Sequence, residues 1–221
     1  MKKQYIDSRC FNKYAIMKQD QMPSLLKAMS ICTENSIFVE IGTWKGDFAE
    51  ALLKFTRCKK LYCVDPYRHF TNDEYPDAMN DLSQRDFDAV FENTKTRLSK
   101  YADRVEFIRK PSVEAAQIFA DESVDFAYID GNHDYAYVDA DIKAWYPKIK
   151  TGGYLCGDDV YSRNLEEHDS DNNIIKVWSY DANHKPSCWG KYGTYPACIK
   201  NELDLGVKFE FDETQFSCLR K

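Results

Sequence analysis

The sequence predicts an α/β fold with a doubly wound, mostly parallel sheet and a C-terminal antiparallel hairpin. Short apolar runs of strand length alternate with longer segments whose apolar residues recur at helical spacing. Near-continuous apolar strands separated by helices are typical of a parallel sheet that is covered on both faces. Near the end of the chain, "VKFEF" and "QFSCLR" flank "DET", which predicts the hairpin.

Each element is assigned from its own pattern. Helices follow from apolar residues three or four positions apart, strands from apolar runs between turn residues, and a proline is tolerated in the first turn of a helix. In order, the expected elements are a helix at 22–34, a strand at 36–41, a helix with Phe48, Leu52 and Phe55 on one face, a strand at 60–65, a helix at about 82–101, a strand at 104–109, a short helix opened by Pro111 and Ser112, a strand at 124–130, a helix carrying Val138, Ile142, Trp145 and Ile149, and a strand at 153–159. Polar stretches lie at 66–80 and 161–173.

The composition favours a soluble enzyme or binding protein that acts on small molecules. Of the 221 residues, 43% are hydrophobic and 30% charged, and the net charge of -6 gives no basic surface for nucleic acid. No stretch is apolar enough for a signal peptide or a membrane span, so we expect a cytoplasmic protein without membrane partners. The eight cysteines are scattered, and we expect reduced, mostly buried thiols.

The carboxyl ends of the first two expected strands carry residues suited to a nucleotide cofactor, because ligands of open α/β sheets bind at that edge. In "VEIGTWKG", Glu40 ends the strand, Gly42 permits a tight turn, and Gly46 lets the next helix begin close to a ligand. Asp65 in "CVDPY" is placed to accept hydrogen bonds from ribose hydroxyls. The alternative is that the glycines only form a turn and Asp65 only caps the next segment.

The ends of the fourth and fifth strands are acidic. Asp130 in "IDGNHDY" and the pair Asp158 and Asp159 in "GGYLCGDD" would meet at adjacent strand ends, where three carboxylates repel one another unless a cation lies between them. Oxygen ligands favour a hard ion, Mg²⁺ above all. His133 is a further ligand, a base beside the metal, or a surface imidazole that caps the following helix.

These motifs resemble those of class I S-adenosylmethionine-dependent methyltransferases, whose fold is Rossmann-like. The likeness covers about 36–160: "VEIGTWKG" is similar to the family's first motif and "VDPY" to its second. The resemblance implies that Glu40, Gly42, Thr43 and Gly46 hold the methionine end of S-adenosylmethionine and that Asp65 holds the ribose. It further places Ser112 near the adenine and gives Asp130 a contact with the cofactor.

The metal motif resembles that of metal-dependent O-methyltransferases acting on sugars of macrolide and aminocoumarin antibiotics, whose metal carboxylates match Asp130, Asp158 and Asp159. Catechol O-methyltransferase has a similar spacing, with an acidic residue and an amide 28 and 29 residues after its first aspartate. In this chain Asp158 and Asp159 stand 28 and 29 residues after Asp130. In that enzyme a lysine stands at the place of His133. The resemblance implies Mg²⁺ or another divalent cation, with His133 or Asp130 taking the proton.

The expected function is therefore Mg²⁺-dependent transfer of a methyl group to a hydroxyl of a small molecule, a sugar or glycan before a catechol. Stacking faces for a sugar could come from aromatic residues near the strand ends and beyond: Tyr67, Tyr135, Tyr137, Tyr161, Trp178 and Trp189. Two other classes stay open, an NAD-binding oxidoreductase and a non-catalytic cofactor-binding protein. A homo-oligomer is also left open.

We expect one methyltransferase domain over the 221 residues. Residues 1–35 would form a helical extension, 36–160 the cofactor and metal core, and 161–221 an acceptor-side insert with the terminal hairpin. The segment 161–200 matches no motif of the family.

Overall fold

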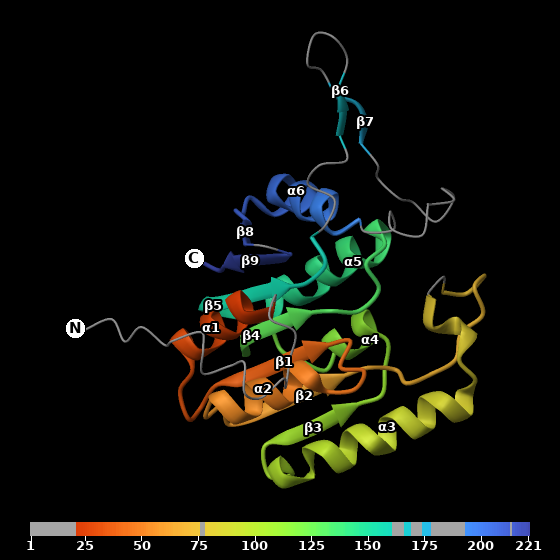
Figure 1. Cartoon of the computed structure of the whole chain (residues 1–221). Helices are drawn as coiled ribbons and strands as arrows, with labels where there is room; N and C mark the ends of the chain where they lie inside the picture. The colour runs from red at the N-terminus through yellow and green to blue at the C-terminus, as the bar shows by residue number, and fades with distance from the viewer. Residues whose placement is uncertain (1–20, 76–77, 161–165, 169–173, 178–192, 213) are drawn as a thin grey trace.

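A computed structural model describes residues 21–75, 78–160, 166–168, 174–177, 193–212 and 214–221. Its helices and strands alternate through most of the chain (Figure 1). The helices are α1 (Met22–Ile31), α2 (Asp47–Phe55), α3 (Gln84–Leu98), α4 (Ser112–Ala116), α5 (Tyr135–Trp145) and α6 (Thr194–Leu205), with short 3-10 turns η3 (Ala78–Asp81), η4 (Ser99–Tyr101) and η5 (Tyr146–Lys148). The strands are β1 (Ile37–Ile41), β2 (Lys60–Val64), β3 (Val105–Ile108), β4 (Val124–Ile129), β5 (Ile149–Gly157), β6 (Glu166–His168), β7 (Ile174–Val177), β8 (Glu210–Asp212) and β9 (Gln215–Leu219).

Seven strands form one sheet in the order β3-β2-β1-β4-β5-β9-β8. Strands β1 to β5 are parallel, and β9 and β8 are antiparallel additions at one edge. In chain order, β2 and β3 lie on one side of β1, and β4 then lies on the other side of β1. The predicted doubly wound sheet with a C-terminal hairpin is confirmed, and β6 and β7 pair in a separate two-stranded sheet.

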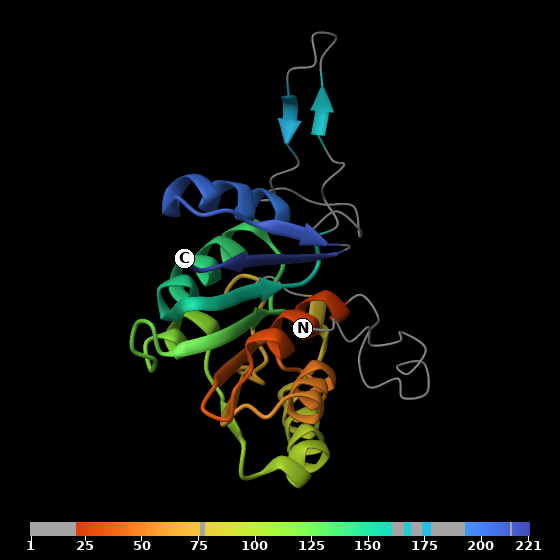
Figure 2. The same ribbon diagram turned by 90° about the vertical axis from the view of Figure 1, so that its left-hand side faces the viewer.

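Helices cover both faces of the sheet, with α1, α2 and α3 on one side and α4, α5 and α6 on the other (Figure 2). Along β4, alternate residues face opposite cores: Phe126 and Tyr128 pack with α1 and α2, whereas Ala127 and Ile129 pack with α5. Both faces of the central strands are therefore buried, which explains their near-continuous apolar sequences.

Two details of the predicted elements are wrong. Ile149 is the first residue of β5 and pairs with Val124, because the 3-10 turn that contains Pro147 has already ended the helix. Helix α6 was not predicted at all, and it packs on α5 through buried residues that include Ala197 and Cys198. The other three residues named for this helix, Val138, Ile142 and Trp145, do lie in α5, and all three are buried.

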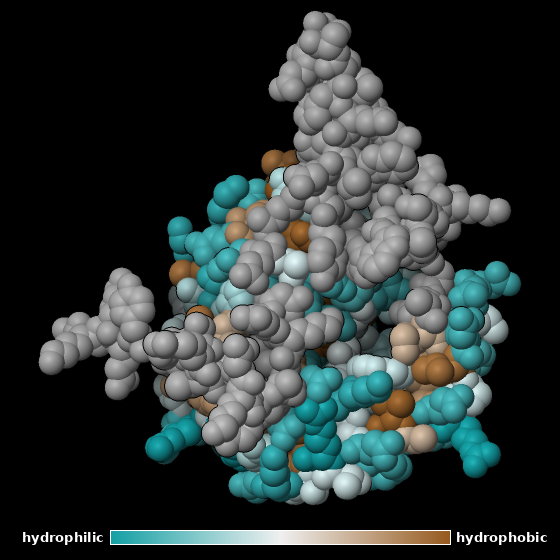
Figure 3. Space-filling model, viewed as in Figure 1, coloured by the Kyte–Doolittle hydropathy of each residue, from teal (hydrophilic) through white to brown (hydrophobic). Residues whose placement is uncertain are grey.

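Five of the six described cysteines are buried, as expected, and all six are free thiols. The large exposed apolar side chains come from separate elements, and on the face in Figure 3 the hydrophobic residues of the described part lie in small separate groups. They are Leu26, Met79, Val113, Ile118, Leu203 and Leu219. None of the described helices is both long and apolar enough to span a bilayer.

Candidate functional site

The turns that follow β1, β2, β4 and β5 lie side by side at the carboxyl edge of the sheet. Backbone hydrogen bonds extend past the strands there: Gly42 N donates to Val64 O (2.8 Å), and Asp130 N donates to Ile41 O (2.8 Å). Asp158 N likewise donates to Ile129 O at 3.0 Å. The sequence-predicted residues of the two acidic motifs and of the glycine turn are thus brought to one edge.

Glycine is required at position 42 because of the neighbouring turn. Gly42 has a φ of +85°, and a Cβ atom there would lie 2.0 Å from the carbonyl oxygen of Asp130. Gly46, with a φ of +74°, begins α2 and faces Thr94 of α3, whose Cγ2 would lie 3.0 Å from an added Cβ. The positive φ of Gly42 fits the predicted tight turn, and the missing side chains of the two glycines also leave room for the turn after β4 and for α3.

Glu40 and Thr43 provide buried polar atoms beside this turn. Glu40 is 2% exposed, and its Oε2 has no hydrogen-bond partner among the described residues. The hydroxyl of Thr43 is also buried and unpaired within the described part of the chain. Burial, followed by the charge of Asp130, raises the pKa of Glu40 well above its ordinary value. Unpaired buried polar atoms are rare in folded proteins, so these two fit a bound polar ligand such as the methionine end of the cofactor.

Asp65 lies at the end of β2 and holds the neighbouring backbone in place. Its Oδ2 accepts a hydrogen bond from Trp44 N and its Oδ1 from Tyr67 N, both at 2.8 Å. A carboxylate oxygen can accept two hydrogen bonds, so acceptor capacity for ribose hydroxyls is compatible with these contacts. Tyr67 is fully buried and its hydroxyl donates to Trp44 O at 2.7 Å. The expectation that Tyr67 offers a stacking face to a sugar is therefore wrong.

The backbone is strained at three of these turns. Trp44, Tyr67 and Asp159 have φ values of 47°, 45° and 61°, a region that residues other than glycine rarely occupy. Each such residue costs about 1 to 3 kcal/mol and persists only where the surrounding structure fixes it. The strain follows β1, β2 and β5 at the same edge, as is common at ligand sites.

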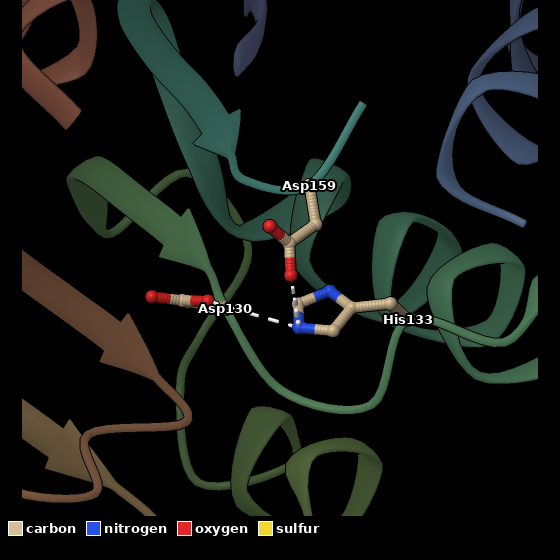
Figure 4. A group of neighbouring side chains, drawn as sticks. All are labelled: Asp130, His133 and Asp159. Atoms are coloured by element: carbon tan, nitrogen blue, oxygen red, sulfur yellow. Dashed lines mark ion pairs between the residues drawn. The ribbon is translucent and has the colours of Figure 1, made fainter. Parts of the chain in front are cut away.

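Asp130, His133 and Asp159 form a compact group at the ends of β4 and β5 (Figure 4). The Nε2 atom of His133 lies 2.9 Å from Asp159 Oδ2 and 3.9 Å from Asp130 Oδ1. One potential ligand atom from each of the three side chains lies within 4.8 Å of the others. Two carboxylates and an imidazole are donors that divalent ions accept, so the group fits the predicted cation.

The hydrogen bond from His133 to Asp159 favours the protonated form of the imidazole. Burial alone would lower the pKa of His133, but the hydrogen bond to Asp159 and the charges of the nearby aspartates outweigh it, and the pKa is raised. The main-chain oxygen of His133 accepts from Gly193 N at 2.7 Å, which ties the turn to the start of α6. Helix α5 has Asp134 as its N-cap residue, so the alternative role of His133 as a helix cap is wrong.

Asp158 is 1% exposed and is bonded mainly to β9 and its preceding turn. Its Oδ1 accepts hydrogen bonds from Gln215 Nε2 (2.8 Å), Thr214 Oγ1 (3.2 Å) and Asp159 N (2.8 Å). Its Oδ2 lies 3.4 Å from the Nε2 of Gln21, which also donates to Asp130 Oδ2 at 3.1 Å. Sequence reasoning missed Gln21, Thr214 and Gln215, because none of them belongs to a motif.

Ser112 lies at the start of α4 and is bonded toward α5. Its Oγ accepts a hydrogen bond from Trp145 Nε1 at 2.9 Å. Asp141 is buried beside it, and burial raises the pKa of this carboxyl group to about 7, despite a hydrogen bond with Ser112. Ser112 thus lies after β3 as expected, and its hydroxyl is hydrogen-bonded to side chains of α5.

The comparisons with known proteins agree with this arrangement. A family model described as a methyltransferase domain matches residues 39–160, from β1 to just past β5. Among curated proteins, no sequence matches the chain.

Several solved structures share the fold. A Staphylococcus aureus protein assigned as a caffeoyl-CoA O-methyltransferase has a TM-score of 0.59 and 12% identity, over 95% of this chain and 87% of that one. A methyltransferase from Podospora anserina bound to S-adenosylhomocysteine (SAH) has a TM-score of 0.57 and 15% identity, over 93% and 80%. An rRNA methylase from Streptococcus thermophilus has a TM-score of 0.53 and 12% identity, over 91% and 95%. Because the family model spans more than half of the sequence, from the glycine turn to the second acidic motif, the chain belongs to the methyltransferase-domain family.

Proposed function

We propose that the protein transfers a methyl group from S-adenosylmethionine to a hydroxyl of a small molecule, with the help of a divalent cation. The observation that carries the proposal is the Asp130–His133–Asp159 group lying next to the unpaired carboxylate oxygen of Glu40. A cofactor subsite and an acceptor subsite must adjoin for methyl transfer, because the reaction needs the two reacting atoms in line. Membership in the methyltransferase-domain family supports this reading over an NAD-binding oxidoreductase.

Each end of the proposed site has its own task. The ends of β1 and β2 would bind the cofactor, with Glu40, Gly42, Thr43 and Gly46 at its methionine end and Asp65 at its ribose. Asp130, Asp158 and Asp159 would hold Mg²⁺, which when bound lowers the pKa of an acceptor hydroxyl. The imidazole of His133, oriented by Asp159 at 2.9 Å, is placed to receive the proton.

For the acceptor, we propose a sugar or glycan hydroxyl. This choice depends on the likeness of the acidic motifs to those of sugar O-methyltransferases. A catechol or phenol is the second candidate, favoured by the spacing of Asp130, Asp158 and Asp159 and by the shared fold of the Staphylococcus aureus protein. The net charge of -6 argues against a nucleic-acid acceptor.

The test is a screen for SAH release. Free sugars, nucleotide-linked sugars and catechols would each be incubated with S-adenosylmethionine and enzyme, with Mg²⁺ and with EDTA. Mg²⁺-dependent SAH release with a sugar supports the proposal, and release with catechols alone replaces the sugar by the second candidate. A protein that binds SAH in calorimetry but releases none with any acceptor would favour a non-catalytic cofactor-binding role.

A further inference from the structure

Gln21, the residue directly before α1, reaches into the acidic group from a distant part of the chain. Its side-chain Nε2 lies 3.1 Å from Asp130 Oδ2 and 3.4 Å from Asp158 Oδ2. Gln21 is 3% exposed, so its amide is almost fully removed from water. The two carboxylates that it joins follow different strands, β4 and β5, and neither is its neighbour in sequence.

Helix α1 is fixed in place by polar and apolar contacts. Ser24 Oγ donates to Gln215 Oε1, and Gln215 Nε2 donates in turn to Tyr128 OH (2.9 Å) and Asp158 Oδ1 (2.8 Å). Leu25 and Ala28 are fully buried in the same core cluster as Tyr128. The position of Gln21 is therefore set by the packing of α1 against the sheet, and its amide is held beside the carboxylates before any ligand binds.

The other end of this amide is unpaired. Gln21 Oε1 is buried and has no hydrogen-bond partner among the described residues. A buried acceptor without a partner destabilises the folded protein. The two ends of an amide have nearly the same shape, so a half-turn about the last side-chain bond would exchange Oε1 and Nε2 without new steric cost.

After that half-turn, Oε1 would stand about where Nε2 now stands, close to Asp130 Oδ2 and Asp158 Oδ2. Three oxygens so placed repel one another unless a cation lies among them. Neighbouring oxygens around an octahedral Mg²⁺ lie about 3 Å apart, because each is 2.0 to 2.1 Å from the ion. The present separations of 3.1 and 3.4 Å are close to this spacing.

We propose that Gln21 Oε1 is a ligand of the divalent cation, so that the residue before α1, outside the methyltransferase core, supplies part of the metal site. The inference deepens the proposed function and rests on its cation. Without the ion, Nε2 holds Asp130 and Asp158 together by hydrogen bonds; with the ion, Oε1 replaces it. Asp130 then joins the two parts of the site, since its Oδ1 faces His133 and its Oδ2 faces Gln21.

The experiment measures metal binding directly. Mn²⁺ would be titrated into the wild type, Gln21→Ala, Gln21→Glu and the control Gln117→Ala, which removes an exposed amide just after α4. Free Mn²⁺ would be followed by electron paramagnetic resonance. We expect about a tenfold or greater loss of affinity in Gln21→Ala, tighter binding in Gln21→Glu, and no change in the control. SAH affinity, measured by calorimetry, should stay within about twofold of the wild type in all four proteins.

If Gln21→Ala binds Mn²⁺ as tightly as the wild type or more tightly, the inference is overturned, because the Gln21 amide then gives the ion no ligand. Loss of SAH binding in both Gln21 variants would also overturn it and would assign Gln21 to the docking of α1. If the wild type itself binds no Mn²⁺, both the cation of the proposed function and the ligand role of Gln21 are refuted. Binding by the wild type with an unchanged Gln21→Ala refutes only the role of Gln21.

Discussion

Asp141 is a carboxylic acid buried in α5, and it makes the stability of the fold sensitive to pH. Its pKa is raised to about 7 by burial, whereas an unfolded aspartate titrates near 3.9. The contribution of the protonated Asp141 carboxyl group to the free energy of unfolding is thus fully present below about pH 4 and is lost as the pH rises through about 7. Asp141→Asn keeps the size of the side chain and an acceptor for Ser112 but does not titrate.

We therefore expect the free energy of unfolding of Asp141→Asn to rise relative to the wild type by about 1 to 3 kcal/mol between pH 5 and pH 8. Urea denaturation at the two pH values measures this change. Asp103→Asn, which alters an exposed aspartate, serves as the control. A difference between Asp141→Asn and the wild type that is the same at both pH values contradicts the prediction.

Asp65 is expected to act on cofactor affinity. Asp65→Ala should weaken SAH binding by about 1 to 3 kcal/mol in calorimetry, because it removes acceptors for ribose hydroxyls. It also leaves the Trp44 and Tyr67 amides without their acceptor, so part of the loss comes from a loosened turn.

Tyr67→Phe separates these two causes. It removes the hydrogen bond from the tyrosine hydroxyl to Trp44 O and leaves the Asp65 carboxylate in place. We expect Tyr67→Phe to bind SAH more tightly than Asp65→Ala. Equal losses in the two variants would mean that Asp65 supports the turn and does not touch the cofactor.

At the residue level, the sequence reveals those site residues that share a motif. Asp130, His133 and Asp159 lie at two strand ends that a parallel sheet must bring together, so their proximity follows from the order of the strands. Gln21 reaches the same place only because α1 docks on β4 and β5, which no local pattern predicts. The side-chain direction of Asp158 likewise depends on Gln215 in β9.

Helix α3 illustrates how one terminal residue stabilises an element. Ser83 precedes the helix, its side chain accepts from Asp86 N, and the Asp86 carboxylate accepts from Ser83 N at 2.9 Å, which together form a capping box. Ser83→Ala should lower the free energy of unfolding by about 1 kcal/mol and the melting temperature by about 2 to 4 °C. Ser30→Ala, which removes an exposed hydroxyl bonded within α1, is the control for thermal melts. Equal melting of Ser83→Ala and the wild type would show that the cap contributes nothing.

The elements differ in how clearly the sequence marks them. The strands β1 to β5 are short apolar runs between polar turns, and each is correctly placed to within a few residues. Helix α6 has a proline, Pro196, in its first turn, and it is held by contacts with α5. Tertiary packing selects α6, and for this reason its local sequence gives little sign of it.

On the scale of the whole molecule, the order of the strands divides the site into two halves. The residues proposed for the cofactor lie at the ends of β1 and β2, and those proposed for the cation, apart from Gln21, follow β4 and β5. The strand order reverses at β1, since β2 and β3 lie on one side of it and β4 on the other. The halves meet where Gly42 packs on the carbonyl group of Asp130. A ligand in one half is thus next to the other half while being held by different side chains.

This division predicts that cofactor binding and methyl transfer respond differently to chelation. EDTA should abolish methyl transfer, because the proposed cation is the group that lowers the pKa of the acceptor hydroxyl. SAH affinity should change by less than about tenfold, because Glu40, Thr43 and Asp65 lie at the ends of β1 and β2 and none of them is a proposed ligand of the cation. Calorimetry with SAH and an assay of SAH release, each with EDTA and with excess Mg²⁺, measure the two effects.

Two controls make this test decisive. EDTA already loaded with Mg²⁺ should leave activity intact, which separates metal removal from an effect of the chelator itself. Asp159→Ala should reproduce the effect of EDTA on methyl transfer at low Mg²⁺ while keeping SAH affinity, since it removes a proposed ligand and the partner of His133. Full activity in EDTA together with full activity of Asp159→Ala would mean that the aspartates at the ends of β4 and β5 do not hold a catalytic cation, and that methyl transfer depends on orientation by the protein alone.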